Sequence, residues 1–188
     1  MERVLAIKSG IKSKAYMLGF IQVILGSLFL ALMALVKIPL YPTPVTLQTL
    51  AVFILALSLG SKKGAMACAL YLVEASLGAP VLSGGISNPL WMIGCNAGFL
   101  ISFPIAAFVI GFMLEKIHVK TFFKVVGCIL CGQFCIDVLG LSGLSLFFGV
   151  HKAFALGCMP FVPNMIIKVL LAASVYSPIV KVQKKYFC

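Results

Sequence analysis

The sequence has few charged residues, and those it has are almost all positive. Charged side chains make up 10% of the 188 residues, with four carboxylates against 15 lysines and arginines. Hydrophobic side chains make up 62%, and the mean hydropathy is +1.17. A fold in water could not cover so much apolar surface with so few polar groups. The composition therefore excludes a soluble globular protein and predicts an integral membrane protein with a single domain, residues 1–188.

Several kinds of catalytic chemistry are also absent from the sequence. Its two histidines form no HExxH motif, and there is no Ser/His/Asp set and no carboxylate pair at glycosidase spacing. We therefore expect no enzyme activity, no metal site and no cofactor. The formal net charge of +11 does not indicate nucleic-acid binding, because the cations lie in short segments between apolar runs, where they orient a membrane protein.

The apolar runs predict an all-α membrane protein with six transmembrane helices. They cover residues 16–36, 46–60, 64–77, 93–114, 123–149 and 154–180. The first run, about 20 residues long, exceeds a typical signal-peptide core and suits a membrane helix. The second and third have about 14 residues each, or ~21 Å, so they are too short to span alone as straight helices. Such short segments are tolerated inside a bundle or beside a cavity.

The distribution of positive charge tests this number of helices. If the N-terminus is cytoplasmic, twelve lysines and arginines fall on the inner side and only Lys37 and Lys152 on the outer side, with Lys168 inside the sixth run. This asymmetry follows the positive-inside rule, and a missing or extra helix would have scrambled it. Both termini are therefore predicted to be cytoplasmic.

Two of the predicted outer loops are rich in proline or glycine. Residues 38–46 read IPLYPTPVT, and residues 78–94 read GAPVLSGGISNPLWMIG. Proline fixes φ and glycine permits close backbone approach, so these loops can be shaped around a ligand. The alternative is a pair of simple turns, with Trp91 as an anchor at the membrane interface.

Two charges lie deep within predicted membrane helices. Asp137 is 13 residues beyond Lys124. Lys168 is 13 residues before Lys181, so both sit roughly 20 Å along their helices. An ionised lysine at the bilayer centre costs at least ~2.5–3.5 kcal/mol, and such residues pair or mark a ligand pathway. A ligand-binding role is favoured for Lys168. The alternative is a structural ion pair with Asp137 or with Glu74, which is also a candidate contact for a coupling protein.

The seven cysteines raise a redox alternative. Cys128, Cys131 and Cys135 share one helix face, and a CxxC pair in a membrane helix is compatible with a membrane thiol oxidoreductase. However, Lys124 places Cys128 near the cytoplasmic, reducing side, and the number of cysteines is odd. Simple packing of small thiols among apolar neighbours is therefore favoured.

Five stretches of the sequence carry the motifs of a known family in the family's order. They read IPLYPTPVTLQTL from residue 38, LGSKKGAMACALYL from 59, LGAPVLSGG from 77, GCNAGFLISFPIAAFVIG from 94 and ALGCMPFVPNMIIK from 155. The chain resembles the biotin-specific substrate-binding membrane subunit of energy-coupling-factor vitamin transporters, the BioY family. The resemblance covers about residues 27–170.

The resemblance implies a fold, a ligand and partners. It implies six helices with a pocket near the outer face, covered by the first outer loop, that binds biotin with high affinity and delivers it across a bacterial plasma membrane. It also implies a transmembrane coupling subunit and two ABC ATPases. Ser27 and Ala31, a small-x-x-x-small pair, match the place where this family docks its coupling subunit. The runner-up function is a substrate-binding subunit for another vitamin or small anion.

The resemblance and the residues together give a set of candidate ligand contacts. We expect Lys168 to donate to the ureido carbonyl of biotin or to pair with its carboxylate, and Asp137 or Asn96 to accept from the ureido N–H groups. Aromatic side chains are expected to cover the apolar ring and chain. The full candidate set is Lys168, Asp137, Asn96, Asn164, Phe99, Trp91, Tyr41 and Gln48.

The sequence departs from the family pattern at several of these positions. The family usually has Gly-Asp where this chain has Asn164-Met165, and that Asp is one of the family's ligand contacts. Asn96 stands for a Thr and Phe99 for a Tyr, and Asp137 stands where an aromatic residue is usual. We interpret Asp137 as the replacement for the missing carboxylate. The alternative is a pocket that accepts a somewhat different ligand.

Overall fold

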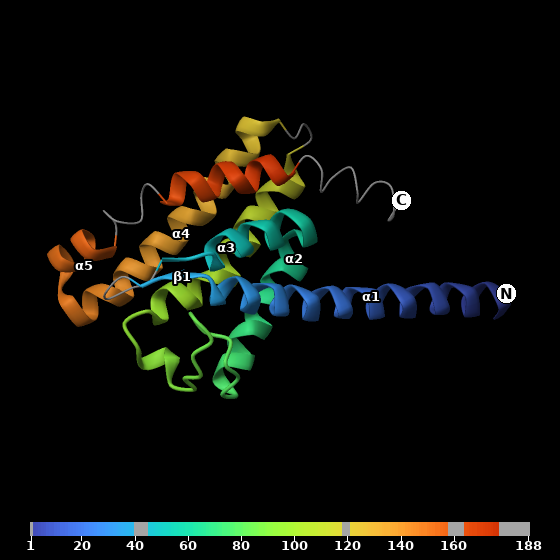
Figure 1. Ribbon diagram of the computed structural model, residues 1–188. Helices are drawn as coiled ribbons and strands as arrows, with labels where there is room; N and C mark the ends of the chain where they lie inside the picture. Colours follow the sequence, from blue (N-terminus) through green and yellow to red (C-terminus); the bar gives the residue numbers. More distant parts are fainter. Residues whose placement is uncertain (1, 40–44, 118–120, 158–163, 177–188) are drawn as a thin grey trace.

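The fold is a bundle of helices with one very short hairpin, seen in a computed structural model that describes residues 2–39, 45–117, 121–157 and 164–176 (Figure 1). The elements in chain order are α1 Glu2–Leu35, β1 Lys37–Ile38, β2 Val45–Thr46, α2 Gln48–Ser76, the 3-10 turn η1 Trp91–Ile93, α3 Ala97–Lys116, α4 Phe122–Phe148 and α5 Val150–Gly157, followed by the helix Asn164–Tyr176. Among the described residues, four helices are long and apolar enough to cross a membrane: Tyr16–Leu35 within α1, and α2, α3 and α4.

The second and third predicted crossings are two arms of α2, joined at one glycine. Gly60 has φ 79° and ψ −174°, a backbone that only glycine adopts easily, and the helix breaks there. The two arms pack closely against each other next to this turn. A Cβ built on Gly64 of the second arm would lie only 3.2 Å from the Cα of Ala56 in the first arm. The polar loop expected at 61–63 is therefore wrong: those residues are helical, and the turn needs only Gly60.

The turn at Gly60 is held by the end of α3. The Glu115 carboxylate accepts a hydrogen bond from the Ser61 backbone N–H at 2.7 Å and from the Ser61 hydroxyl at 2.9 Å. A carboxylate at the first turn of a helix satisfies free N–H groups there. Gly111 allows α3 to lie close to the turn at Gly60, because a Cβ at position 111 would collide with the backbone of Ser61.

Ser27, one of the two predicted docking residues on α1, packs inside the chain. Ser27 is fully buried, and its hydroxyl donates a 2.6 Å hydrogen bond to Glu74 Oε1 on α2. Ala31 is partly buried against the same core. The small side chain of Ser27 therefore serves close contact between α1 and α2, and its role in docking a coupling subunit stays a prediction. A contact of Ala31 with a coupling subunit stays a prediction.

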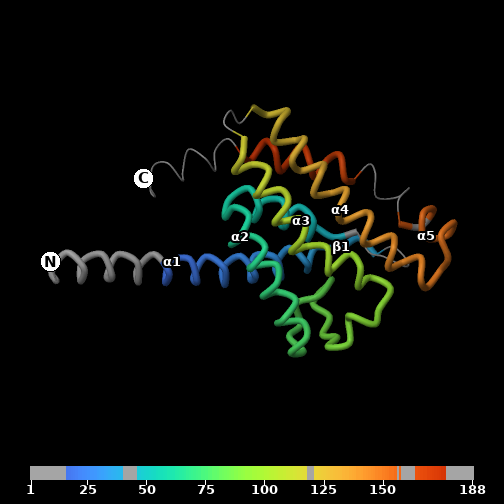
Figure 2. Tube along the Cα trace, turned by 180° about the vertical axis from the view of Figure 1, so that it is seen from behind, coloured from blue at the N-terminus to red at the C-terminus, as the bar shows by residue number. Residues whose placement is uncertain are grey.

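The sixth predicted crossing consists of two pieces in the described part of the chain, α5 and the helix Asn164–Tyr176, with residues 158–163 outside the description. Figures 1 and 2 both show β1, α5 and the loop between α2 and α3 at the end of the bundle opposite to the C-terminal end of α3. Two residues predicted for the inner side, Lys63 and Glu115, lie at the same turn: Lys63 donates to Gln22 of α1 at 2.7 Å, and Glu115 binds Ser61. These contacts agree with successive helices that cross in opposite directions. The location of both termini on the cytoplasmic side stays a prediction.

Candidate ligand pocket

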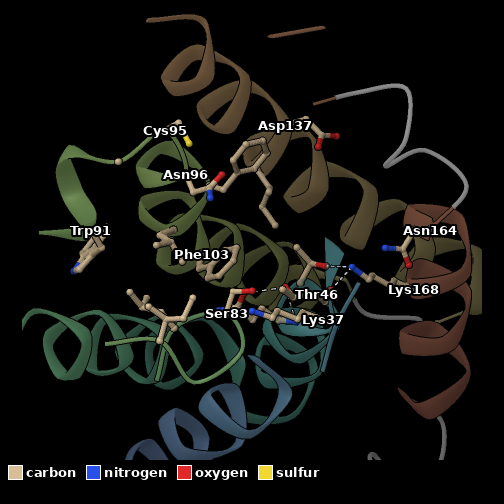
Figure 3. Close-up of a pocket in the computed structure, with 18 of the residues that line it drawn as sticks. Lys37, Thr46, Ser83, Trp91, Cys95, Asn96, Phe103, Asp137, Asn164 and Lys168 are labelled. Carbon is tan, nitrogen blue, oxygen red and sulfur yellow. Dashed lines mark hydrogen bonds between the residues drawn. The ribbon is translucent and has the colours of Figure 1, made fainter. Parts of the chain in front are cut away.

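A cavity of about 430 Å³ lies at the end of the bundle that carries the hairpin (Figure 3). It is enclosed by β1, β2, the start of α2, the loop between α2 and α3, the first turns of α3, the middle of α4 and the helix Asn164–Tyr176. Aromatic and aliphatic side chains form much of its wall, and a few polar groups converge on it. Cavities of this size and composition suit small organic ligands.

Lys168 projects into this cavity from the last helix and is almost completely buried, with 5% of its surface exposed. Its ammonium donates to the backbone carbonyl of Thr46 at 2.5 Å and to the hydroxyl of Thr49 at 2.7 Å. An ammonium carries three donors, so one remains for a ligand. Lys168 makes no ion pair with Asp137, and the expected structural alternative is therefore wrong for these two residues.

Asp137 also lines the cavity, together with a second polar residue of α4. Gln133 lies one turn earlier, is 7% exposed, and donates from Nε2 to Asp137 Oδ1 at 2.7 Å. The two side chains therefore form a fixed pair that offers oxygen acceptors to a ligand. Glu74, the other candidate partner for Lys168, is bound to Ser27 and does not line the cavity.

The loop between α2 and α3 is shaped around the cavity. Trp91 in η1 is 3% exposed, lines the cavity, and donates from Nε1 to the Ser76 hydroxyl at 3.0 Å. The alternative of an interfacial anchor at Trp91 is thus wrong. Asn96 and Phe99 line the cavity at the start of α3. Gly140 of α4 makes room for Phe99, because a Cβ there would collide with the aromatic ring.

A chain of hydrogen bonds joins the hairpin, α2 and this loop. The Thr46 hydroxyl donates to Gln48 Oε1 at 2.8 Å, and Gln48 Nε2 donates to the Tyr71 hydroxyl at 2.7 Å. The Tyr71 hydroxyl in turn donates to the carbonyl of Val81 at 3.0 Å. Gln48 lines the cavity. The network therefore holds its amide in one orientation, with Gln48 in the first arm of α2 and Tyr71 in the second.

Seven of the eight candidate ligand contacts line this one cavity, and Tyr41 lies outside the described residues. Asn164 starts the last helix, and its Nδ2 is buried without a hydrogen-bond partner among the described residues. That these seven side chains touch a ligand stays a prediction. Their convergence from five separate segments is a property of the fold.

Sequence reasoning missed six polar residues that line the same cavity. They are Lys37, Thr46, Thr49, Ser83, Asn88 and Gln133. Lys37 was interpreted only as an outer-side charge, although it is the single charge in the first outer loop. Gln133 carried a signal too, because it precedes Asp137 by four residues and so shares its helix face.

The cysteines in the described part of the chain form no disulfide. Cys128 is buried and Cys131 is exposed, and both are free. Neither lines the cavity, although Cys95 does. Within the described residues, no three His, Cys, Asp or Glu side chains lie close enough together to hold a metal ion.

Comparison with known proteins gives a consistent picture. The sequence model of the BioY family matches residues 8–185. The chain is 35% identical over 156 residues to the biotin transporter BioY of Thermotoga maritima, covering 81% of this chain and 91% of the relative. It is 33% identical over 154 residues to the probable biotin transporter BioY of Pyrococcus horikoshii, covering 80% and 91%.

One solved structure has the same fold. It is the S-component for biotin from an ECF-type ABC transporter, which superposes with a TM-score of 0.81 and covers 89% of this chain and 93% of its own. The sequence identity is 24%. The all-α, six-helix membrane fold expected from the sequence is thereby confirmed.

Proposed function

Because the chain belongs to the BioY family, we propose that it binds biotin from the outer side of a membrane and hands it on as the substrate-specific subunit of an ATP-driven transporter. Its relatives are named as biotin transporters, which agrees with the expectation of a protein that is not an enzyme. The single observation that carries the proposal is one cavity of about 430 Å³ that Lys168, Asp137 and Asn96 all line.

The chemistry of the cavity suits the chemistry of biotin. The ureido ring offers two N–H donors and one carbonyl acceptor. The acceptor oxygens of the Gln133–Asp137 pair and of Asn96 match the N–H groups, and the free donor of Lys168 matches an acceptor. Phe99, Trp91 and other apolar side chains supply a wall for the fused ring and the aliphatic tail.

The transporter would draw its energy from other chains. The stretch from Gly127 to Gly132 has the glycine spacing of a phosphate-binding loop, but Gln133 and Phe134 follow in place of Lys and Ser/Thr, and both lie in α4. We therefore propose as partners a transmembrane coupling subunit and two ABC ATPases. The chain itself is a multi-pass membrane protein, and we place it in the plasma membrane of a bacterium.

One observation favours a second candidate, a subunit for another vitamin or small anion. Met165 lines the cavity where the family usually presents a carboxylate, so the acceptor set differs from the usual one. The thiol oxidoreductase is disfavoured, because Cys128 and Cys131 face different surroundings and neither reaches the cavity.

A binding assay with the purified, full-length protein in detergent tests the proposal. Biotin, desthiobiotin, lipoate and other vitamins are titrated in parallel, and heat release or ligand retention is measured. Tight binding of biotin, with weaker binding of lipoate, is the expected result. Selective binding of another vitamin would replace biotin by that ligand, and no binding of any of them would refute the proposal.

A further inference from the structure

A second lysine lines the cavity, at the hairpin. Lys37 belongs to β1 and is the cross-strand partner of Thr46, whose carbonyl accepts a hydrogen bond from Lys168. The two cations therefore reach the same cavity from either side of strand β2. Asp137 is the one carboxylate among the residues that line it. The cavity thus carries an excess of positive charge and suits a ligand with a negative end.

The Lys37 side chain lies directly over a glycine turn of the loop between α2 and α3. Gly84 has φ 75°, and a Cβ built on it would lie 2.8 Å from Lys37 Cδ and would collide with the ammonium itself. Ser83 precedes this glycine and also lines the cavity. In Figure 3, Ser83, Lys37 and Thr46 lie along one side of the cavity, while Asn96 and Asp137 lie along the other.

Neither group at this place has a hydrogen-bond partner among the described residues. The Ser83 hydroxyl is buried and has no hydrogen-bond partner among the described residues. The Lys37 ammonium likewise has no acceptor within residues 2–39, 45–117, 121–157 and 164–176. A buried, unpaired hydroxyl is unfavourable, and it is commonly explained by a partner that the site is built to receive.

From these contacts we propose that Lys37 and Ser83 form an anion subsite that holds the carboxylate of the ligand. The inference rests on the proposed function and assigns the orientation of the ligand within it. The Lys37 ammonium and the Ser83 hydroxyl both donate to the carboxylate. The ureido ring then lies toward Lys168, whose ammonium already has two neutral acceptors and keeps one donor for a neutral carbonyl.

The exposure of the two lysines supports this division of roles. Lys168 is buried, whereas Lys37 is an exposed residue at the edge of the cavity. A carboxylate held by Lys37 keeps part of its hydration, so the charged end of the ligand needs less desolvation there than beside Lys168. The neutral ring is the end that is better suited to the buried position.

The test compares biotin with biotinamide, which lacks the negative charge but keeps the ring and tail. Wild-type protein should bind biotin at least about tenfold more tightly than biotinamide, as expected for a charge-assisted hydrogen bond. The K37M variant should lose about tenfold in affinity for biotin and keep its affinity for biotinamide. K37R should restore most of the preference, and S83A should show a smaller loss in the same direction.

The matched control is K152M, which removes the other lysine predicted for the outer side. Lys152 is exposed and does not line the cavity, so both affinities should stay unchanged. Equal binding of biotin and biotinamide by the wild type, or unchanged biotin affinity in folded K37M, would overturn the subsite and leave the proposed function intact. Absence of biotin binding by the wild type would overturn both.

Discussion

The ammonium of Lys168 donates a 2.7 Å hydrogen bond to the hydroxyl of Thr49, across 119 positions of the sequence. The bond joins the last described helix to the first turn of α2, at the wall of the cavity. Lys168 therefore ties the last helix to α2 and β2 at the hairpin end of the bundle, and it lines the cavity at the same place. The sequence had suggested these roles as alternatives.

The first prediction concerns Lys168 itself. Lys168→Met should abolish measurable biotin binding, a loss of about 100-fold or more, because it removes a charged donor from a buried site. The variant should remain folded, since methionine fills similar space without burying a charge. Isothermal titration gives the affinity, and elution on size exclusion gives the folding. Thr49→Val is the milder comparison, and normal affinity in Lys168→Met would remove this residue from the site.

The second prediction separates the two carboxylates inside the membrane. Asp137→Asn should weaken biotin binding by about tenfold, because the amide replaces an acceptor oxygen by a donor group. Glu74→Gln is the matched control: Glu74 binds Ser27 away from the cavity, so the dissociation constant should not change. An unchanged affinity in Asp137→Asn would refute its role as the substitute for the family's missing Asp.

The third prediction uses two buried tyrosines. Tyr71→Phe should lower stability by about 1–2 kcal/mol, because its hydroxyl links Gln48 to the carbonyl of Val81 and both groups would be left unpaired. Tyr176→Phe should be neutral or slightly stabilising, since its hydroxyl is buried without a partner among the described residues. Thermal unfolding in detergent measures both. Equal effects of the two substitutions would count against the network described for Gln48.

The fourth prediction concerns glycine in two settings. Gly60→Ala should destabilise the protein by about 1–3 kcal/mol, because φ is 79° there and a Cβ would lie 2.7 Å from Glu115 Oε1. Gly127→Ala should be neutral or stabilising by up to about 1 kcal/mol, because it lies within α4 and a Cβ would meet nothing within 4 Å. Melting temperatures of the two variants check the difference, and a stable Gly60→Ala protein would contradict the turn.

The fifth prediction addresses the thiols. The double variant Cys128→Ser, Cys131→Ser should bind biotin with wild-type affinity, because neither side chain lines the cavity. Titration of the reduced protein is the measurement. Loss of binding in a double variant that still elutes as a folded protein would favour the redox alternative.

Hydropathy and charge predicted the helices well, because the cost of exposing backbone and charge to lipid acts on long segments and leaves a pattern in the sequence. The position of Lys168 and Asp137 inside apolar runs also marked them as unusual, and both residues line the cavity. The sequence pattern could not show that Lys168 and Asp137 form no ion pair. Lys168 instead donates to Thr46 and Thr49, and Asp137 accepts from Gln133. Such choices depend on short distances between segments far apart in the chain.

The sequence also could not predict in which direction single side chains point. The hydrogen bond from Ser27 to Glu74 could not be foreseen, because a small-x-x-x-small motif gives a spacing along α1 and not the face that α2 covers. Lys37 was interpreted only as a charge on the outer side of the membrane, whereas in the structure it lines the cavity. The turn at Gly60 was hidden for a similar reason, since two lysines follow it and indicated a loop where the helix resumes at once.

The break in α2 has a mechanical consequence. One arm runs from Gln48 to the turn at Gly60, and the other returns to Ser76, which holds Trp91. Each arm therefore carries part of the cavity at its outer end, roughly 18–24 Å from the shared pivot. A small change in the angle between the arms, imposed at the Gly60 turn where Glu115 binds Ser61, would widen or narrow the cavity at the far ends of the arms. Under the proposed function, a coupling subunit that binds near Gly60 would act in this way on a ligand held at the far ends of the two arms.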